Sequence, residues 1–229
     1  MHPEYARQLA AKVPVRKRLW QQVVRTKIRA QAAALAIVVG DDDGLGGFVR
    51  RVRSGDPDNI EAQVARRYWS RIFENDAFRR DREATDTNAV LNYGYTVLRG
   101  MTGRAVCAVG LHPSLSLHHH NRYSQFTLAD DLMEPFRPVV DLAAVAIRRA
   151  RGPDAPVDKD TKAELLAALG RRFRHDGECR TLFDVLARVA SSLVAVFEGQ
   201  RPGLALPDFP EFLEVDGDGS GEVSTTAPR

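Results

Sequence analysis

The amino-acid sequence predicts a mainly α-helical protein, a helical bundle with a disordered acidic C-terminal tail. Two observations predict this fold class: long segments repeat apolar residues at helical spacing, and no run of strand-like alternation stands out. The 229 residues, 44% of them hydrophobic, suffice for one large domain. We place this helical domain at residues 1–200. The flexible tail is predicted at 201–229, where prolines, glycines and acids accumulate.

The first predicted helix covers residues 15–39. Trp20, Val24 and Ile28 follow one face of it, which is the pattern of an amphipathic helix. A loop rich in aspartate and glycine ends this helix, and a short helical piece is expected at 48–53.

Asp58 is predicted to cap the next helix, which runs to about Phe73. Glu61 stands three residues after Asp58, at the spacing of a capping box. Capping alone would therefore account for Glu61, and a catalytic role is the alternative.

The later helices are separated by a polar connection from Gly110 to Phe126 and by a proline-containing break near 152–156. Thr127 is expected to cap the helix that follows the polar connection. The helix predicted at 87–110 is apolar on nearly all sides, so we expect it at the centre of the bundle. The predicted ranges are 87–110, about 127–151, 159–169 and 179–199.

The cysteines, the apolar runs and the charge distribution indicate where the protein resides and what it can bind. Cys107 and Cys179 lie far apart and form neither a metal-binding pair nor a disulfide framework, which favours a reducing cytoplasm. No apolar run is long enough to cross a bilayer, and the first residues lack the apolar core of a signal peptide. Residues 1–40 carry eight basic side chains against one acid, which suits either phosphate contacts or a solvated helix face.

One group of polar residues is compatible with a metal site. One histidine of the run 118–120 could ligate an ion, although a solvated loop explains the run equally. Glu134 follows Asp131 by three residues and Asp130 by four, so either pair projects from one side of a helix, but acids in a first turn also stabilise the helix dipole. Two carboxylates, Glu61 among them, and one imidazole would suit Mg²⁺ or Mn²⁺, and the imidazole favours manganese.

Four segments that together cover roughly residues 55–140 form a recognisable series. They are GDPDNIEAQVARRYW (55–69), NAVLNYGY (88–95), GLHPSLSLHH (110–119) and LADDLMEPFRP (128–138). In this order they resemble motifs of the CRISPR-associated protein one family, the integrases of CRISPR adaptation. The double histidine with ADDLMEPFRP resembles the type II branch.

The resemblance implies that Glu61, His119 and Glu134 are catalytic and hold Mg²⁺ or Mn²⁺. His119 is chosen by its fifteen-residue spacing to Glu134, and His118 or His120 takes the role if the loop register differs. Further residues are expected near the site: Asp131 as a nearby acid, Asn88, Asn92 and Tyr93 as lining, bracing or simply packing residues, and Arg66 and Arg122 as phosphate contacts.

The implied reaction is a transesterification, in which the 3′-hydroxyl of a short DNA attacks a phosphodiester at the repeat boundary of a CRISPR array. With water as the nucleophile, the same site would act as an endonuclease. The implied partners are the short insert DNA, the CRISPR array, the small CRISPR-associated protein two, a second copy of this chain and, in type II systems, the large RNA-guided effector nuclease.

Family members carry a small β-rich domain before the helical domain, and this chain begins near the start of the helical part. The sequence therefore predicts that the β-rich domain is lacking. This leaves a second hypothesis, a catalytically silent DNA-binding or assembly subunit. A third hypothesis is a helical nucleic-acid-binding protein whose acids are structural, and it predicts that Glu61, His119 and Glu134 do not converge.

Overall fold

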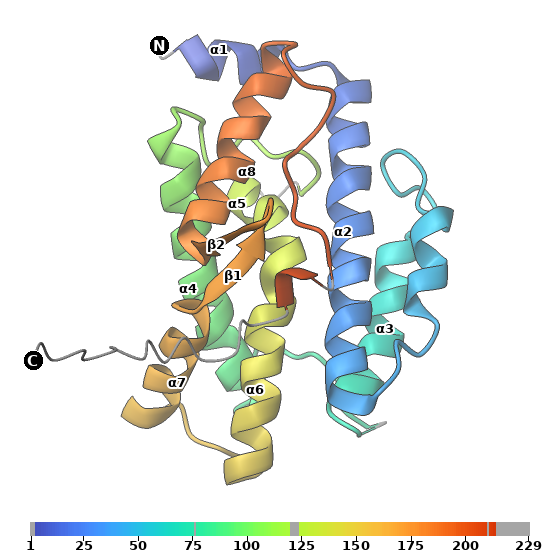
Figure 1. Ribbon diagram of the computed structural model, residues 1–229, viewed down its shortest axis with the longest axis vertical. Coiled ribbons are helices and arrows are strands. Elements are labelled where there is room, and N and C mark those ends of the chain that lie inside the picture. The colour runs from blue at the N-terminus through green and yellow to red at the C-terminus, as the bar shows by residue number, and fades with distance from the viewer. Residues whose placement is uncertain (1–2, 76, 120–123, 210, 214–229) are drawn as a thin grey trace, which may run out of the picture.

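The long helix α2 (Val13–Val39) lies between α3 and the other helices of the bundle (Figure 1). The computed structural model describes residues 3–75, 77–119, 124–209 and 211–213. The other helices in these ranges are α1 (Pro3–Ala10), α3 (Ile60–Ile72), α4 (Thr87–Ala108), α5 (Thr127–Met133), α6 (Arg137–Arg151), α7 (Lys159–Leu169) and α8 (Leu182–Phe197). Short 3₁₀ turns are η1 (Leu45–Arg51), η2 (Glu134–Phe136) and η3 (Glu211–Leu213), and two strands are β1 (Arg172–His175) and β2 (Glu178–Thr181).

Helix α2 joins the two sides of the molecule. It contacts η1, α3, η2 and α6. Figure 1 shows α3 on one side of α2 and α6 on the other. The predicted stripe of Trp20, Val24 and Ile28 is buried. Gly40 ends the helix with φ of 90°, a left-handed conformation that glycine adopts readily. Elements far apart in sequence therefore meet over the length of one buried helix.

Helix α4 forms the centre of the other side, as its apolar sequence predicted. It packs against α5, α6, α7 and α8. Gly94 permits a close approach to α6, because a Cβ at this position would lie 2.4 Å from Cγ1 of Val140. The predicted mainly α fold class is confirmed.

The capping prediction for α3 is wrong. Asn59, with φ of 51°, is the N-cap, while Asp58 forms a two-bonded ion pair with Arg53 (2.8 and 2.9 Å). The carboxylate of Asp56 accepts hydrogen bonds from two backbone N–H groups of the first turn, including that of Glu61 at 3.0 Å. The side chain of Glu61 therefore takes no part in capping and is available for other contacts.

The helix predicted at 127–151 is divided into α5, η2 and α6. Pro135 and Pro138 lack the backbone N–H groups that a continuous helix would need. Thr127 does not cap α5: Phe126 is the N-cap, and the Thr127 hydroxyl donates to the carbonyl of Ser114 at 2.8 Å. The break places Glu134 in a turn between two helices.

The helix predicted at 179–199 is preceded by an unpredicted β-hairpin. Strands β1 and β2 pair antiparallel around Asp176 and Gly177, which have φ of 53° and 72°. An Asp-Gly pair with two positive φ angles is the signature of a tight type I′ hairpin. Helix α8 then starts at a capping box formed by Thr181 and Asp184.

Part of the predicted tail belongs to the packed domain. Phe209, Phe212 and Leu213 are buried, and the Phe212 ring stacks on Phe173 of β1 with centroids 4.7 Å apart. Residues 214–229 lie outside the described residues. In the part of the chain that is described, no helix has the length and apolar character needed to span a membrane.

Candidate metal and DNA site

Glu61 and Glu134 meet on one cation, the ammonium group of Lys27. Glu61 lies in the first turn of α3, Glu134 in η2 and Lys27 near the middle of α2. The Lys27 Nζ atom lies 2.5 Å from Oε1 of Glu61 and 2.6 Å from Oε2 of Glu134. Arg137 contacts the other oxygen of Glu134, with Nη2 2.9 Å from Oε1. The packing of α3 and η2 against α2 thus brings together the two predicted acids.

The charges of this cluster are fixed by each other. Burial alone would raise the pKa of Glu134, but the positive charges of Arg137 and Lys27 lower it to about 2. Burial alone would lower the pKa of Lys27, but Glu134 and Glu61 raise it above its ordinary value. At neutral pH the Glu134 carboxylate and the Lys27 ammonium are therefore both charged.

Asp131 holds the loop that carries His119. Its carboxylate is fully buried and accepts hydrogen bonds from the backbone N–H groups of Leu117 (2.6 Å), His118 (3.0 Å) and His119 (3.2 Å). Oδ1 of Asp131 also lies 2.6 Å from Nδ1 of His119. The acid thus fixes both the backbone of the loop and the orientation of one imidazole.

This contact determines which ring nitrogen can act as a ligand. An Nδ1–H that donates to Asp131 leaves Nε2 with a free lone pair, the arrangement seen in carboxylate–histidine–metal sites. The hydrogen bond that His119 donates to Asp131 raises the pKa of His119, burial opposes this, and the charges of Asp131, Glu134 and Glu61 raise it further. His119 therefore lies within the electrostatic reach of both glutamates.

Trp20 separates the roles of the neighbouring histidines. The ring of His118 stacks on Trp20 with centroids 4.4 Å apart and an interplanar angle of 3°, whereas His119 meets Trp20 edge-on at 5.2 Å. His118 is thus engaged in packing, while His119 is held by Asp131. His120 lies outside the described residues.

The donor types fit a hard divalent ion. Glu134 Oε2 is buried and has no hydrogen bond of normal geometry, although Lys27 lies 2.6 Å away. Two carboxylates and an imidazole nitrogen suit Mn²⁺ or Mg²⁺. Within the described ranges, however, no three histidine, cysteine or acidic side chains are arranged closely enough to hold an ion. The carboxylates are closed around an ammonium group instead.

An arginine-rich cavity of about 560 Å³ adjoins His119 and Glu134. Arg99 is held there by Asp130, with Nε 2.7 Å from Oδ1, and by the hydroxyl of Ser124 at 2.6 Å. Planar guanidinium groups suit phosphate oxygens, which they bind through two parallel hydrogen bonds. Among the residues that the structure describes, Arg80, Arg82, Arg99 and Arg137 line the cavity.

Two of the predicted neighbouring residues brace this cavity. The side-chain oxygens of Asn88 and Asn92 both accept hydrogen bonds from Arg80, and Asn92 also donates to the carbonyl of Arg82. Tyr93 is not brought to the cluster: it packs on the core beneath Lys162 of α7, whose Nζ lies 5.5 Å from the ring centroid.

The two predicted phosphate contacts have different outcomes. Arg66 is exposed on α3 and lines a second cavity of about 710 Å³ with Trp69 and Arg79. Arg80 lines this cavity and the first one, so the two are neighbours. Arg122 lies outside the described residues.

A buried polar cluster lies behind the cavity. Asp141 accepts hydrogen bonds from the hydroxyls of Tyr68 (2.8 Å) and Tyr95, and the guanidinium of Arg137 lies 4.5 Å from the Tyr95 ring centroid. Burial raises the pKa of Asp141 to about 6, although the hydrogen bonds from both tyrosines act in the opposite direction.

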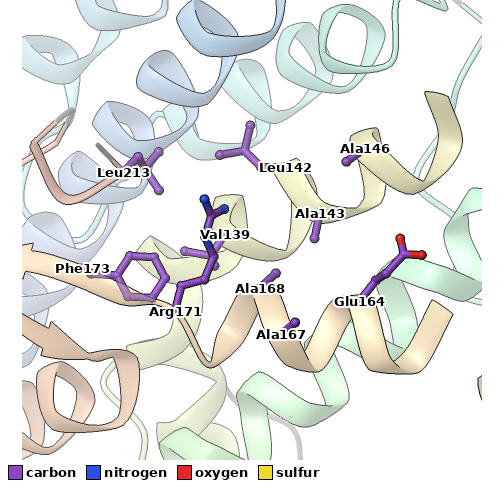
Figure 2. Close-up of a pocket in the computed structure, with 10 residues that line it drawn as sticks. All are labelled: Val139, Leu142, Ala143, Ala146, Glu164, Ala167, Ala168, Arg171, Phe173 and Leu213. Atoms are coloured by element: carbon purple, nitrogen blue, oxygen red, sulfur yellow. The ribbon is translucent and has the colours of Figure 1, made fainter. Parts of the chain in front are cut away.

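A third cavity, of about 470 Å³, carries no comparable chemistry. Figure 2 shows it between α6 and α7, where Ala143 and Ala146 face Ala167 and Ala168, with Glu164 at the edge. Its lining is mostly apolar, and it contains none of the residues of the carboxylate cluster.

Sequence reasoning missed the basic half of the site. Lys27 follows the same helical stripe as Trp20, Val24 and Gln31, and a lysine on an otherwise buried face is a detectable signal of an internal partner. Arg137 stands three residues after Glu134, a spacing at which helical side chains meet.

The sequence model of the family described as CRISPR associated protein Cas1 matches residues 57–172, half of the chain. A CRISPR-associated endonuclease Cas1 of Neisseria meningitidis serogroup C is 33% identical over 88% of this chain and 66% of its own length. A CRISPR-associated endonuclease Cas1 of Pyrobaculum aerophilum is 31% identical over 58% of this chain and 45% of its own length. The chain thus spans about half to two thirds of these relatives.

Solved structures share the fold. A casposase bound to an integration product has a TM-score of 0.74 at 21% identity, covering 93% of this chain and 70% of that one. A Cas6-RT-Cas1–Cas2 complex has a TM-score of 0.71 at 18% identity, covering 88% of this chain and 26% of that one. The match of the family model over residues that include Glu61, His119 and Glu134 shows that the chain belongs to the CRISPR associated protein Cas1 family.

Proposed function

We propose that this chain is a metal-dependent DNA integrase and endonuclease of CRISPR spacer acquisition. It would join the 3′-hydroxyl of a short DNA to a phosphodiester at the repeat boundary of a CRISPR array. The observation that carries the proposal is the meeting of Glu61 and Glu134 on one cation, beside His119 and an arginine-lined cavity. Relatives named as endonucleases and the casposase bound to an integration product support it.

Glu61, Glu134 and Nε2 of His119 would hold Mg²⁺ or Mn²⁺. When bound, such an ion polarises a phosphoryl oxygen and stabilises the charge of the departing oxyanion. Glu134 contributes a permanent negative charge, because its pKa is about 2. Asp131 keeps the imidazole in the tautomer and orientation in which Nε2 can bind.

The arginines position the DNA. Arg82 is exposed at the cavity, and Arg99 is oriented by Asp130, so their guanidinium groups are available to bind DNA phosphates. Arg66 would extend this contact along the neighbouring cavity. Such contacts favour in-line attack mainly by fixing geometry. A bound 3′-hydroxyl gives joining and a water molecule gives cleavage.

The proposed partners are DNA, the small CRISPR-associated protein two and a second copy of this chain, all in the cytoplasm. Similar folds occur in a Cas6-RT-Cas1–Cas2 complex and in a casposase bound to an integration product. The double histidine and the ADDLMEPFRP segment further motivate a type II-like assignment, with the large effector nuclease as an additional partner.

A catalytically silent DNA-binding subunit is the alternative. The meeting of Glu61 and Glu134 on one cation and the contact of Asp131 with His119 favour an active site over a silent one, because burying carboxylates is costly and DNA binding alone does not require it.

The test is an assay with a labelled DNA that has a free 3′ end and a supercoiled CRISPR-array plasmid, in Mn²⁺ or Mg²⁺, with and without the small partner protein. Glu61→Gln and His119→Ala should each lower metal-dependent joining or nicking at least about a hundredfold, since changes to mere supporting residues of metal sites already cost 10–100-fold. Glu164→Gln, an exposed acid on α7, is the matched control. DNA binding without reaction in the unchanged protein would favour the silent subunit.

A further inference from the structure

Lys27 occupies the place between the two carboxylates that are expected to hold the metal ion. Its side chain leaves a buried stretch of α2, and its ammonium contacts Glu61 Oε1 at 2.5 Å and Glu134 Oε2 at 2.6 Å. We propose that Lys27 is a resident counter-cation that competes with the divalent ion for Glu61 and Glu134 and thereby sets the metal affinity of the site.

The charges of Lys27 and Arg137 balance those of the two carboxylates. Glu61 and Glu134 bring two negative charges to a region where only 20% and 5% of their side chains are exposed. Lys27 and Arg137 bring two positive charges in direct contact, so the cluster is neutral without any ion. Leaving a buried carboxylate unpaired would be strongly destabilising. Lys27 thus does in the metal-free protein what a divalent ion would do in the loaded one.

The divalent ion and the Lys27 ammonium need the same carboxylate oxygens. Arg137 holds Glu134 through Oε1, which leaves Oε2 as the oxygen available for exchange. An ion bound there and at Glu61 would meet the Lys27 charge at contact distance, and like charges at that separation repel strongly in a buried site. Metal binding therefore requires Lys27 to leave at least one carboxylate, which its flexible four-carbon stem permits.

This inference rests on the proposed metal-dependent function and gives it a regulatory feature. The affinity for metal is lowered by the free energy of displacing the ammonium, and the protein keeps its fold when no ion is bound. Arg137 differs from Lys27 in this respect, because it bonds only one carboxylate and leaves the space between the two acids open.

The experiment measures Mn²⁺ binding to the full chain by the electron paramagnetic resonance signal of free Mn²⁺, without DNA. Lys27→Met, which keeps the length of the stem but not the charge, should bind Mn²⁺ at least about tenfold more tightly than the unchanged protein, or about 1.4 kcal/mol. Its metal-free melting temperature should be lower, and Mn²⁺ should raise that temperature more. Arg29→Met removes a charge from the exposed side of the same helix and should change neither property.

Lys27→Gln, which keeps hydrogen-bond donors, provides the measurement if the methionine variant does not fold without metal. It should also bind Mn²⁺ more tightly than the unchanged protein. If these variants bind Mn²⁺ no more tightly than the unchanged protein, while Mn²⁺ binding still depends on Glu61, the proposed role of Lys27 is wrong and the metal site itself stands. No Mn²⁺ binding by any of the proteins would contradict the metal site and the proposed function together.

Discussion

Replacing Asp131 by asparagine should destabilise the protein more than the same replacement at its neighbour Asp130. The buried carboxylate accepts hydrogen bonds from three backbone N–H groups and from Nδ1 of His119. The single oxygen of an asparagine can accept at most two of these, and its NH₂ group would then face donors. Losing two charge-assisted hydrogen bonds at about 1.5–3 kcal/mol each gives an expected destabilisation of about 3–6 kcal/mol.

The loss should also reach the metal. Without the carboxylate, neither the orientation of His119 nor the tautomer that exposes Nε2 is fixed, and altered supporting contacts typically lower metal affinity 10–100-fold. Urea unfolding gives the first quantity, and a Mn²⁺ titration of the folded variant gives the second.

Asp130→Asn is the matched control. Asp130 adjoins Asp131 on α5, but its ion pair with Arg99 is partly exposed, with 26% and 37% of the two side chains accessible. Such pairs contribute about 0.2–1 kcal/mol. If Asp131→Asn destabilises the protein no more than Asp130→Asn, the loop is held by other contacts and the reasoning about its carboxylate is wrong.

Two further substitutions test the surroundings of the site. Because burial raises the pKa of Asp141 to about 6 from 3.8, the native state loses stability as pH rises from about 4 to about 6. Asp141→Asn should therefore gain stability relative to the unchanged protein between these pH values, measured by urea unfolding; a difference independent of pH would contradict this. Arg82→Gln should reduce the salt dependence of duplex DNA binding by about 0.9 in the log–log slope, as expected for one phosphate contact. Arg171→Gln, at the apolar cavity, should leave the slope unchanged, and equal slopes for the two variants would exclude a phosphate contact at Arg82.

The sequence predicted most helices because their apolar faces are long and continuous. The predicted range 159–169 matches α7, and the predicted 87–110 ends within two residues of α4. The hairpin at 172–181 was missed although Asp176-Gly177 is a strong local signal, because its strands have only four residues each and leave little room for an alternating pattern. The short helix α1 was missed for the same reason of length.

The sequence predicted that Glu61 and Glu134 lie together, but it did not identify Lys27 as the residue that pairs with both. Family motifs point to Glu61 and Glu134, and the position of His119 followed from spacing. The pairing of Lys27 with both acids depends on how α3 and η2 pack against α2, which no local pattern encodes. The arginine-lined cavity is likewise formed by residues of a loop, α4, α5 and α6. The predicted phosphate contact Arg66 lies on α3 and lines only the neighbouring cavity.

The buried polar residues around Asp141 explain how a site built from several elements keeps its geometry. Tyr68 belongs to α3, Tyr95 to α4 and Asp141 to α6, so one carboxylate ties together three helices. Helix α3 carries Glu61, and α6 begins with Arg137, which holds Glu134 and packs on the Tyr95 ring. A movement of α3 relative to α6 would have to break the Tyr68–Asp141 hydrogen bond in the core. The stability lost by burying Asp141 is therefore the expected cost of holding the carboxylates at a fixed separation, whether a lysine or a metal ion lies between them.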